Sequence, residues 1–205
     1  MTKKLAYPFS ETAIRELRVG ERVSVSGRIF TGRDRLHKHL AEGGETPVSL
    51  KDGAIFHCGP VTVPCGKGWR VVAAGPTTSI REEPYMATII RTCGVRMVIG
   101  KGGMGAKTTE ACREHGCVYL QATGGAAVLL AQRFRRVEGV YFLDTFGATE
   151  ALWVLEADAL EAVVGIDTEG QSLFDNIREQ SKAKLQLLGR VDTKTSHRDV
   201  SFGRK

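Results

Sequence analysis

The sequence contains no apolar run of about 18 residues, the length that a membrane-spanning helix requires, so we expect no membrane association. Its first ten residues, MTKKLAYPFS, also lack the apolar stretch of a secretory signal. Cysteine is scarce, with five residues and no CxxC pair. This pattern predicts reduced thiols in a cytoplasmic protein, with neither a disulfide framework nor a metal site built by this chain.

A strong excess of one charge is missing as well. Lys and Arg number 29 against 23 for Asp and Glu, which gives a net charge of +6. The basic residues are scattered except near the C-terminal end, so they do not predict a nucleic-acid surface. The modest excess favours a small anionic substrate, and we expect no nucleic-acid partner.

Glycine is abundant, with 24 residues, and it separates segments whose apolar patterns indicate alternating strands and helices. This order favours an α/β domain with a mostly parallel central sheet flanked by helices. Early strands without helices between them predict an added β layer.

We expect one domain over residues 1–188 and a polar, basic tail over 189–205. The predicted strands cover 21–34, 54–63 (with a break at Gly59-Pro60), 69–75, 95–100, 117–122, 140–144, 151–157 and a segment from 162. The predicted helices cover 35–43, 85–94, 105–116, 126–137 and a last segment ending near Leu188.

A polar segment, AGPTTSIR, follows the predicted strand at residues 69–75. One of its hydroxyls is explained by capping of the next helix. Capping does not explain three hydroxyls together with an arginine, and Arg81 lies about one helical turn beyond Thr77. The segment is therefore a candidate binding site, although capping alone accounts for part of it.

Two further cationic residues follow predicted strands. Arg33 comes after the strand ending in IFTG, and Lys101 comes after VRMVIG. Ligands bind at strand ends in α/β sheets, and arginine pairs bidentately with carboxylates. Arg33, Arg81 and Lys101 together would suit a dicarboxylate. Taken alone, Arg33 would be explained as a surface arginine near a helix start.

A glycine-rich segment, GKGGMGAKT, offers a competing interpretation as the phosphate-binding loop of an ATPase. Gly100 and Gly105 have the required separation, but Ala106 stands before Lys107 and Thr108, where the motif has none. One extra residue rotates the following side chains by about 100° around a helix. A plain turn between strand and helix is the favoured interpretation.

The histidines are not expected to bind metal. His37 and His39 fall on a short helix that we expect to be exposed, where residues two apart do not share a face. His57 is interpreted as a core or turn residue.

Four segments occur in an order that resembles a known family: TGRD, AGPTTSIR, IGKGGM and VVGIDTEGQSLF. Over residues from about 10 to 178, the chain is similar to the beta subunit, or C-terminal domain, of class I iron-sulfur fumarate hydratases. The L-tartrate dehydratase beta subunit belongs to the same family. The resemblance implies a swivelling β/β/α domain and the reversible addition of water to fumarate, which yields malate.

The resemblance also implies a partner, a cofactor and residue roles. A [4Fe-4S] cluster would be bound by an alpha subunit, in an alpha2beta2-type assembly, and not by this chain. Arg33, Arg81 and Lys101 would bind the small dicarboxylate substrate, and Arg81 and Lys101 would also stabilise the developing charge. Thr77 would be the base that takes the carbon-bound proton.

Some segments depart from the family pattern. REEPY stands where the family usually has Met after the arginine and Asp before Pro-Tyr, and LEADALEAVVGID replaces a segment that commonly contains Asp-Phe-Pro. These differences leave the substrate open among fumarate, tartrate and methylfumarate (mesaconate). An ATPase and an inactive regulatory or scaffolding relative remain as alternatives from other classes.

Overall fold

The chain divides into two units, Met1–Ser172 and Leu173–Lys205, and the computed structural model describes residues 1–195. The second unit contributes one described helix, α7 (Leu173–Thr195), which continues past the predicted end near Leu188. Residues 196–205 of the predicted tail lie outside the described residues. The domain boundary at residue 188 stays a prediction.

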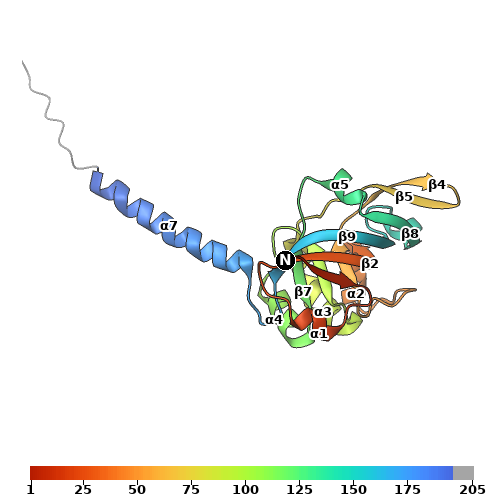
Figure 1. Ribbon diagram of the computed structural model, residues 1–205, viewed down its shortest axis with the longest axis horizontal. Helices are drawn as coiled ribbons and strands as arrows, with labels where there is room; N and C mark the ends of the chain where they lie inside the picture. Colours follow the sequence, from red (N-terminus) through yellow and green to blue (C-terminus); the bar gives the residue numbers. More distant parts are fainter. Residues whose placement is uncertain (196–205) are drawn as a thin grey trace, which may run out of the picture. The chain divides into compact units, whose positions relative to one another are not determined.

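Seven strands of the first unit form one sheet in the order β1-β2-β3-β6-β7-β9-β8 (Figure 1). Pairing is parallel from β1 through β7, whereas β9 runs antiparallel to β2, β7 and β8. Because β9 pairs with both β2 and β7, five of these strands close into a ring. The predicted α/β class with a mostly parallel sheet is confirmed. The strands are β1 (Lys3–Ala6), β2 (Arg22–Gly32), β3 (Ala54–His57), β6 (Met97–Gly100), β7 (Val118–Gln121), β8 (Phe134–Tyr141) and β9 (Leu152–Ile166).

Helices cover one side of the central strands, and in Figure 1 they lie below the sheet. Both faces of these strands are buried: Ile55 and Phe56 point to opposite faces and each is at most 1% exposed. Burial on both faces explains why β3, β6 and β7 read as continuous apolar runs. The helices on this side are α1 (Glu11–Arg15), α2 (Asp34–Ala41), the 3-10 helix η1 (Ser79–Glu82), α3 (Glu83–Cys93) and α4 (Ala106–His115).

The added β layer is a two-stranded sheet of β4 (Val61–Cys65) and β5 (Gly68–Ala73). The strand predicted over residues 69–75 is present as β5, but the expectation that it is buried was wrong, because within β5 Val71 alone is buried. The break predicted at Gly59-Pro60 is present, and it sends β3 and β4 into different sheets.

The helix predicted over residues 126–137 was largely wrong. Only α5 (Ala127–Ala131) is helical, and the chain then enters β8, which pairs with β9. Two register shifts interrupt that pairing and disturb the two-residue alternation that would have indicated a strand. The strand predicted over 140–144 ends at Tyr141 and is followed by α6 (Leu143–Phe146).

The two strands predicted near residues 151–157 and 162 are one strand, β9. It bends at Ala159, whose φ of 54° is left-handed and whose N–H donates to Ser26 Oγ at 3.0 Å. This irregularity lets a single long strand pair with three neighbours.

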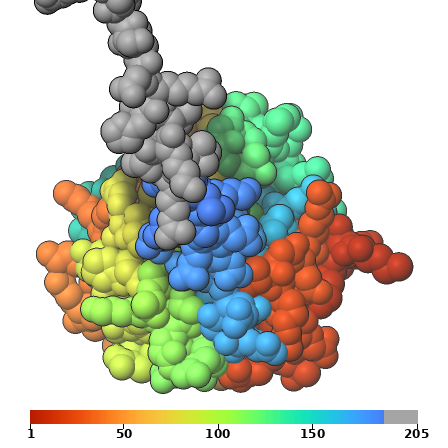
Figure 2. Space-filling view, turned by 90° about the vertical axis from the view of Figure 1, so that its left-hand side faces the viewer, coloured from red at the N-terminus to blue at the C-terminus, as the bar shows by residue number. Residues whose placement is uncertain are grey.

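The segment that contains GIDTEG joins distant parts of the first unit. The buried Asp167 carboxylate accepts the N–H groups of Val19, Glu169 and Gln171 at 3.0–3.1 Å. Figure 2 shows the red-orange N-terminal residues beside the light-blue residues of this turn. The described contacts of Asp167 therefore give this motif a structural role.

Candidate active site

The candidate site lies where three neighbouring parallel strands end. Arg33 directly follows β2, His57 is the last residue of β3, and Lys101 directly follows β6. Since β2, β3 and β6 are adjacent and parallel, these ends share one edge of the sheet. Such an edge is the usual ligand position in open α/β sheets.

The 77–81 segment reaches this edge from the separate β4–β5 sheet. Thr77 N–H donates to the His57 carbonyl at 2.7 Å, and Ser79 N–H donates to the Lys101 carbonyl at 2.9 Å. The segment is thus attached to β3 and to the residue after β6 by backbone hydrogen bonds. Arg81 therefore does not follow a strand of the central sheet, contrary to the arrangement of strand ends predicted from the sequence.

The Thr77 side chain is half-buried, and its hydroxyl donates to the His57 carbonyl at 3.1 Å. The lone pairs of Oγ1 remain available to a second partner. A carbonyl acceptor does not stabilise an alkoxide, so any help in lowering the proton affinity of Thr77 must come from nearby cations.

The two arginines of the site converge on acidic side chains. Arg81 Nη2 donates to Asp34, and Arg33 Nη2 lies 3.8 Å from the same carboxylate. Arg33 Nε is 3.5 Å from Glu150 Oε1. Glu150, for which the sequence contained no signal, also accepts the Arg35 N–H at 2.9 Å near the start of α2.

These pairs influence protonation in a consistent direction. Burial raises the pKa of Asp34, but the hydrogen bond and charge of Arg81 outweigh it and leave that pKa below its ordinary value. The hydrogen bond from Arg81 to Asp34 raises the pKa of Arg81 in turn. Because the Arg81 side chain is 50% exposed, the pair contributes little stability, and substrate can replace Asp34 at modest cost.

Lys101 differs from the arginines. It is half-buried, and among residues 1–187 its ammonium group has no hydrogen-bond or ion-pair partner. A Cβ atom placed on Gly124 would lie 3.5 Å from Lys101 Cδ, so that glycine borders the lysine stem. Lys101 is therefore a cation that the described residues leave uncompensated, as an anion site requires.

Behind this edge lies a layer of buried polar groups that sequence reasoning did not identify as part of the site. His37 was predicted to be exposed, which is wrong: it is fully buried, with Nδ1 2.8 Å from the Arg33 carbonyl and 3.3 Å from the buried Glu82. His57 is a core residue, as expected. Burial, helped by the neighbouring His37, lowers the pKa of His57 well below its ordinary value.

The glycine-rich loop does not form a nucleotide site. The carboxylate of Glu83 occupies the N-terminus of α4, where a phosphate would bind in a P-loop. It accepts the N–H groups of Gly105, Lys107 and Thr108 at 2.7–3.2 Å, and the Thr108 hydroxyl at 2.7 Å. The ATPase alternative is therefore not supported.

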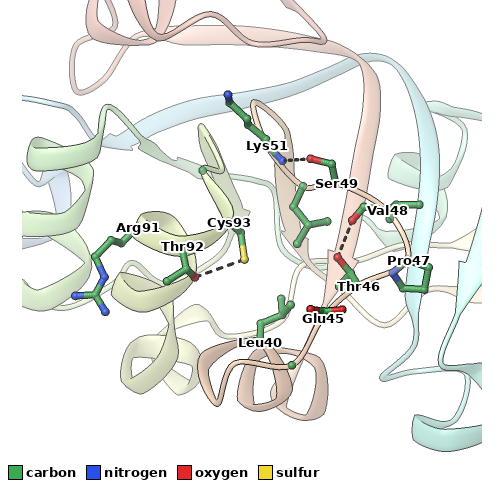
Figure 3. Close-up of a pocket in the computed structure, with 13 residues that line it drawn as sticks. Leu40, Glu45, Thr46, Pro47, Val48, Ser49, Lys51, Arg91, Thr92 and Cys93 are labelled. Carbon is green, nitrogen blue, oxygen red and sulfur yellow. Dashed lines mark hydrogen bonds between the residues drawn. The ribbon is translucent and has the colours of Figure 1, made fainter.

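No group of three His, Cys, Asp or Glu residues in the described part of the chain is arranged to hold a metal ion. A hollow between α2 and the end of α3, lined by Leu40, Lys51 and Cys93 among others, contains none of the four predicted site residues (Figure 3).

None of the helices described has the length and apolar character needed to cross a bilayer.

The fold and the site define an α/β domain with cationic side chains and a hydroxyl at the carboxyl edge of parallel strands. The sequence profile of the family described as Fumarase C-terminus matches residues 3–177. The chain belongs to this family, so the resemblance found in its motifs is confirmed.

Individual relatives support this assignment. The chain is 50% identical over 182 residues to a protein of Geobacillus stearothermophilus provisionally named a class I fumarate hydratase. The match covers 88% of this chain but only 35% of that relative, so the chain spans about a third of its length. The chain is 36% identical to the L(+)-tartrate dehydratase subunit beta of Escherichia coli K12, with coverage of 85% and 87%. It is also 35% identical to a protein of Methanocaldococcus jannaschii provisionally given the same name, with coverage of 86% and 93%.

Proposed function

We propose that the chain is the beta subunit of a hydro-lyase that interconverts fumarate and malate. The observation that carries this proposal is the position of the four residues. Arg33 and Lys101 follow the ends of β2 and β6, and Thr77 is hydrogen-bonded to the end of β3 between them. Arg81 pairs with Asp34, next to Arg33. Cations placed before the reaction stabilise charge as it develops, and they do so most strongly where water is excluded. Membership of the Fumarase C-terminus family supports the same chemistry.

In this proposal the cations bind and the hydroxyl moves a proton. Lys101 and Arg33 each hold a substrate carboxylate, and Arg81 exchanges Asp34 for the substrate. In dehydration, Thr77 Oγ1 reacts as the alkoxide: it takes the proton from the substrate carbon and becomes the neutral hydroxyl. In hydration, that hydroxyl returns the proton and becomes the alkoxide again. The unperturbed pKa of an aliphatic hydroxyl lies far above the ~10 of tyrosine, so this step depends on Lys101 and Arg81.

The proposal requires a partner subunit. The described residues of this chain do not provide ligands for a [4Fe-4S] cluster, and we assign the cluster to an alpha subunit in an alpha2beta2-type assembly. The cluster would supply a Lewis acid for the substrate hydroxyl. Relatives named subunit beta support the existence of such a partner. The swivelling β/β/α arrangement and a cytoplasmic location complete the proposal, and five free thiols agree with that location.

The choice of substrate has a rival. Higher identity favours fumarate, because the relative at 50% is named for fumarate hydratase. The share of each relative that the match covers favours tartrate. The match spans 87–93% of the tartrate dehydratase beta subunits but 35% of the fumarate hydratase. Mesaconate, which adds one methyl group to fumarate, is a third candidate of the same class.

The test is co-expression with the alpha subunit under anaerobic conditions, followed by assays with malate, tartrate and methylmalate. We expect the highest kcat/KM with malate, and neither activity nor bound iron in the isolated chain. A higher kcat/KM with tartrate would establish the rival substrate. Stoichiometric cluster on the isolated chain, or no hydro-lyase activity in the complex, would overturn the proposal.

A further inference from the structure

The buried hydroxyl of Ser79 joins three segments of the site. It lies 3.1 Å from Lys101 N, 3.0 Å from Tyr119 Oη and 2.9 Å from His57 Nδ1. Ser79 is fully buried, although its neighbours Thr78 and Ile80 are exposed. The three contacts come from the residue after β6, from β7 and from the end of β3.

The chemistry of the groups determines the direction of these hydrogen bonds. A hydroxyl accepts two hydrogen bonds and donates one. The Lys101 N–H can only donate, and Tyr119 Oη, which accepts the Gly103 N–H at 3.3 Å, donates its own proton to Ser79. Ser79 must then donate to His57 Nδ1.

The state of His57 agrees with this direction. Burial lowers the pKa of His57, which favours the neutral ring, and a neutral ring that accepts from Ser79 carries its lone pair on Nδ1. The proton is therefore on Nε2, which is buried and has no hydrogen-bond partner among the described residues. The His37 ring lies perpendicular to it, with centroids 5.0 Å apart.

The backbone is shaped to admit Ser79. A Cβ atom added to Gly100 would lie 1.8 Å from Ser79 Oγ, so the hydroxyl could not keep its position beside any other residue. The Ser79 N–H also donates to the Lys101 carbonyl at 2.9 Å. Ser79 therefore binds the peptide groups on both sides of the Lys101 Cα, once through its own backbone and once through its side chain.

We propose that Ser79 is a positioning residue for Lys101: its hydrogen bonds to the Lys101 backbone and to His57 hold this lysine in register with Thr77. The inference rests on the proposed function, because it assumes that Lys101 binds the substrate. Thr77 is anchored to the carbonyl of the same His57 whose ring accepts from Ser79. The buried Ser79 hydroxyl thus links Lys101 to His57, the residue at the end of β3 that also binds Thr77.

The first test concerns the hydrogen-bond direction and needs no activity. Nitrogen-15 NMR of the full chain at neutral pH should show His57 neutral, with Nδ1 unprotonated and the proton on Nε2. Ser79→Ala should alter the Nδ1 shift, whereas Thr78→Ala should leave it unchanged. A proton on Nδ1 in the wild type would overturn the proposed direction.

The second test uses the complex with the alpha subunit and a double-mutant cycle. Ser79→Ala removes the acceptor of the Lys101 N–H, and we expect a loss of about ten- to a hundred-fold in kcat/KM, mainly through KM. Because Ser79 acts through Lys101, Ser79→Ala combined with Lys101→Met should be no worse than Lys101→Met alone. Thr78→Ala is the matched control and should keep wild-type kinetics.

The outcomes separate this inference from the proposed function. Multiplied losses in the double variant, or unchanged kinetics in Ser79→Ala, would show that Ser79 does not position Lys101. If Ser79→Ala fails to fold in a thermal melt, Tyr119→Phe removes one donor to the same hydroxyl and should show a smaller, equally non-multiplicative loss. A wild-type complex without hydro-lyase activity would refute the proposed function, while the NMR test would still decide the hydrogen-bond direction.

Discussion

Two places in the first unit could bind an anion through positive charge or backbone N–H groups. They differ in whether a carboxylate of the chain itself already occupies the position. At the N-terminus of α4, the backbone donors are bound by the chain's own carboxylate, Glu83. At the carboxyl edge of β2, β3 and β6, Lys101 has no acidic partner among residues 1–187. A position that attracts anions is therefore available to a ligand only where no acidic side chain of the same protein already binds there.

The arginines are an intermediate case. Arg81 and Arg33 contact Asp34, and Arg33 also lies near Glu150. These partners keep the guanidinium groups in place without substrate, and they must be exchanged when a dicarboxylate binds. The comparison predicts that removing each group will have a different effect.

The largest effect is expected from Thr77→Ala in the complex with the alpha subunit. General-base loss typically lowers rates by about 10²–10⁴-fold, so kcat should collapse. KM should change little, because the hydroxyl contributes little to holding the dicarboxylate. Steady-state kinetics with malate measure this.

The matched control is Thr78→Ala, an exposed hydroxyl one residue away. It should retain the wild-type kcat. Near-normal kcat in Thr77→Ala would place the base elsewhere, with the partner subunit as the next candidate.

The next effect concerns the cations. Lys101→Met should lower kcat/KM by about ten- to a hundred-fold, the cost of a lost charge-assisted hydrogen bond. Arg81→Met should cost less, because binding substrate requires Arg81 to give up Asp34. The same assay with Arg33→Met should give an intermediate loss. Equal losses in all three would mean that Asp34 and Glu150 do not compete with the substrate.

The variant Glu83→Ala tests the N-terminus of α4, where the chain's own carboxylate binds the backbone donors. Four hydrogen bonds to its carboxylate are lost, and we expect a decrease of about 2 kcal/mol in the free energy of unfolding, measured by urea denaturation. Because α4 then has an open N-terminus, sulfate should stabilise this variant more than it stabilises the wild type.

Glu110→Ala serves as the control, because Glu110 is exposed and, among the residues whose side chains are described, pairs only with Arg113 in the same helix. Its stability should change by a few tenths of a kcal/mol. Mg-ATP should not bind the wild type in equilibrium dialysis. Saturable ATP binding that Lys107→Ala abolishes would contradict the role assigned to Glu83.

The smallest effect is the pH dependence contributed by His57. Its pKa is lowered in the folded state, so below the unfolded pKa of ~6.5 the unfolded chain binds more protons than the folded chain. Stability should therefore fall on acidification below that value, by at most about 1.4 kcal/mol per pH unit from this group.

Urea denaturation between pH 5 and about 7.5 measures this slope. His57→Gln should flatten the slope even if it lowers overall stability. An equally steep slope in the variant would assign the acid sensitivity to other groups.

Much of the fold was predictable from the sequence because its causes are local. Continuous apolar segments ending in glycine or a polar turn marked β3, β6 and β7, and those patterns depend only on near neighbours. The patterns failed for β8 and for the middle of β9. Bulges break the alternation of both strands, and pairing with distant strands stabilises them.

The candidate site divides in the same way. Arg33, Arg81 and Lys101 could be chosen from the sequence, because each stands in a short polar motif near a predicted strand end, whereas Thr77 was chosen through the resemblance to the fumarate hydratase family. The role of Ser79 could not: it was one of three hydroxyls, and its partners are 22 and 40 residues away. Glu150 gave no signal at all, because its contact with Arg33 exists only after β9 has paired with β2.

The sequence by itself determined which residues could bind an anion, through their chemical type and local spacing. The tertiary structure decided which of them have partners, because hydrogen bonds and ion pairs depend on distances that only the folded chain creates.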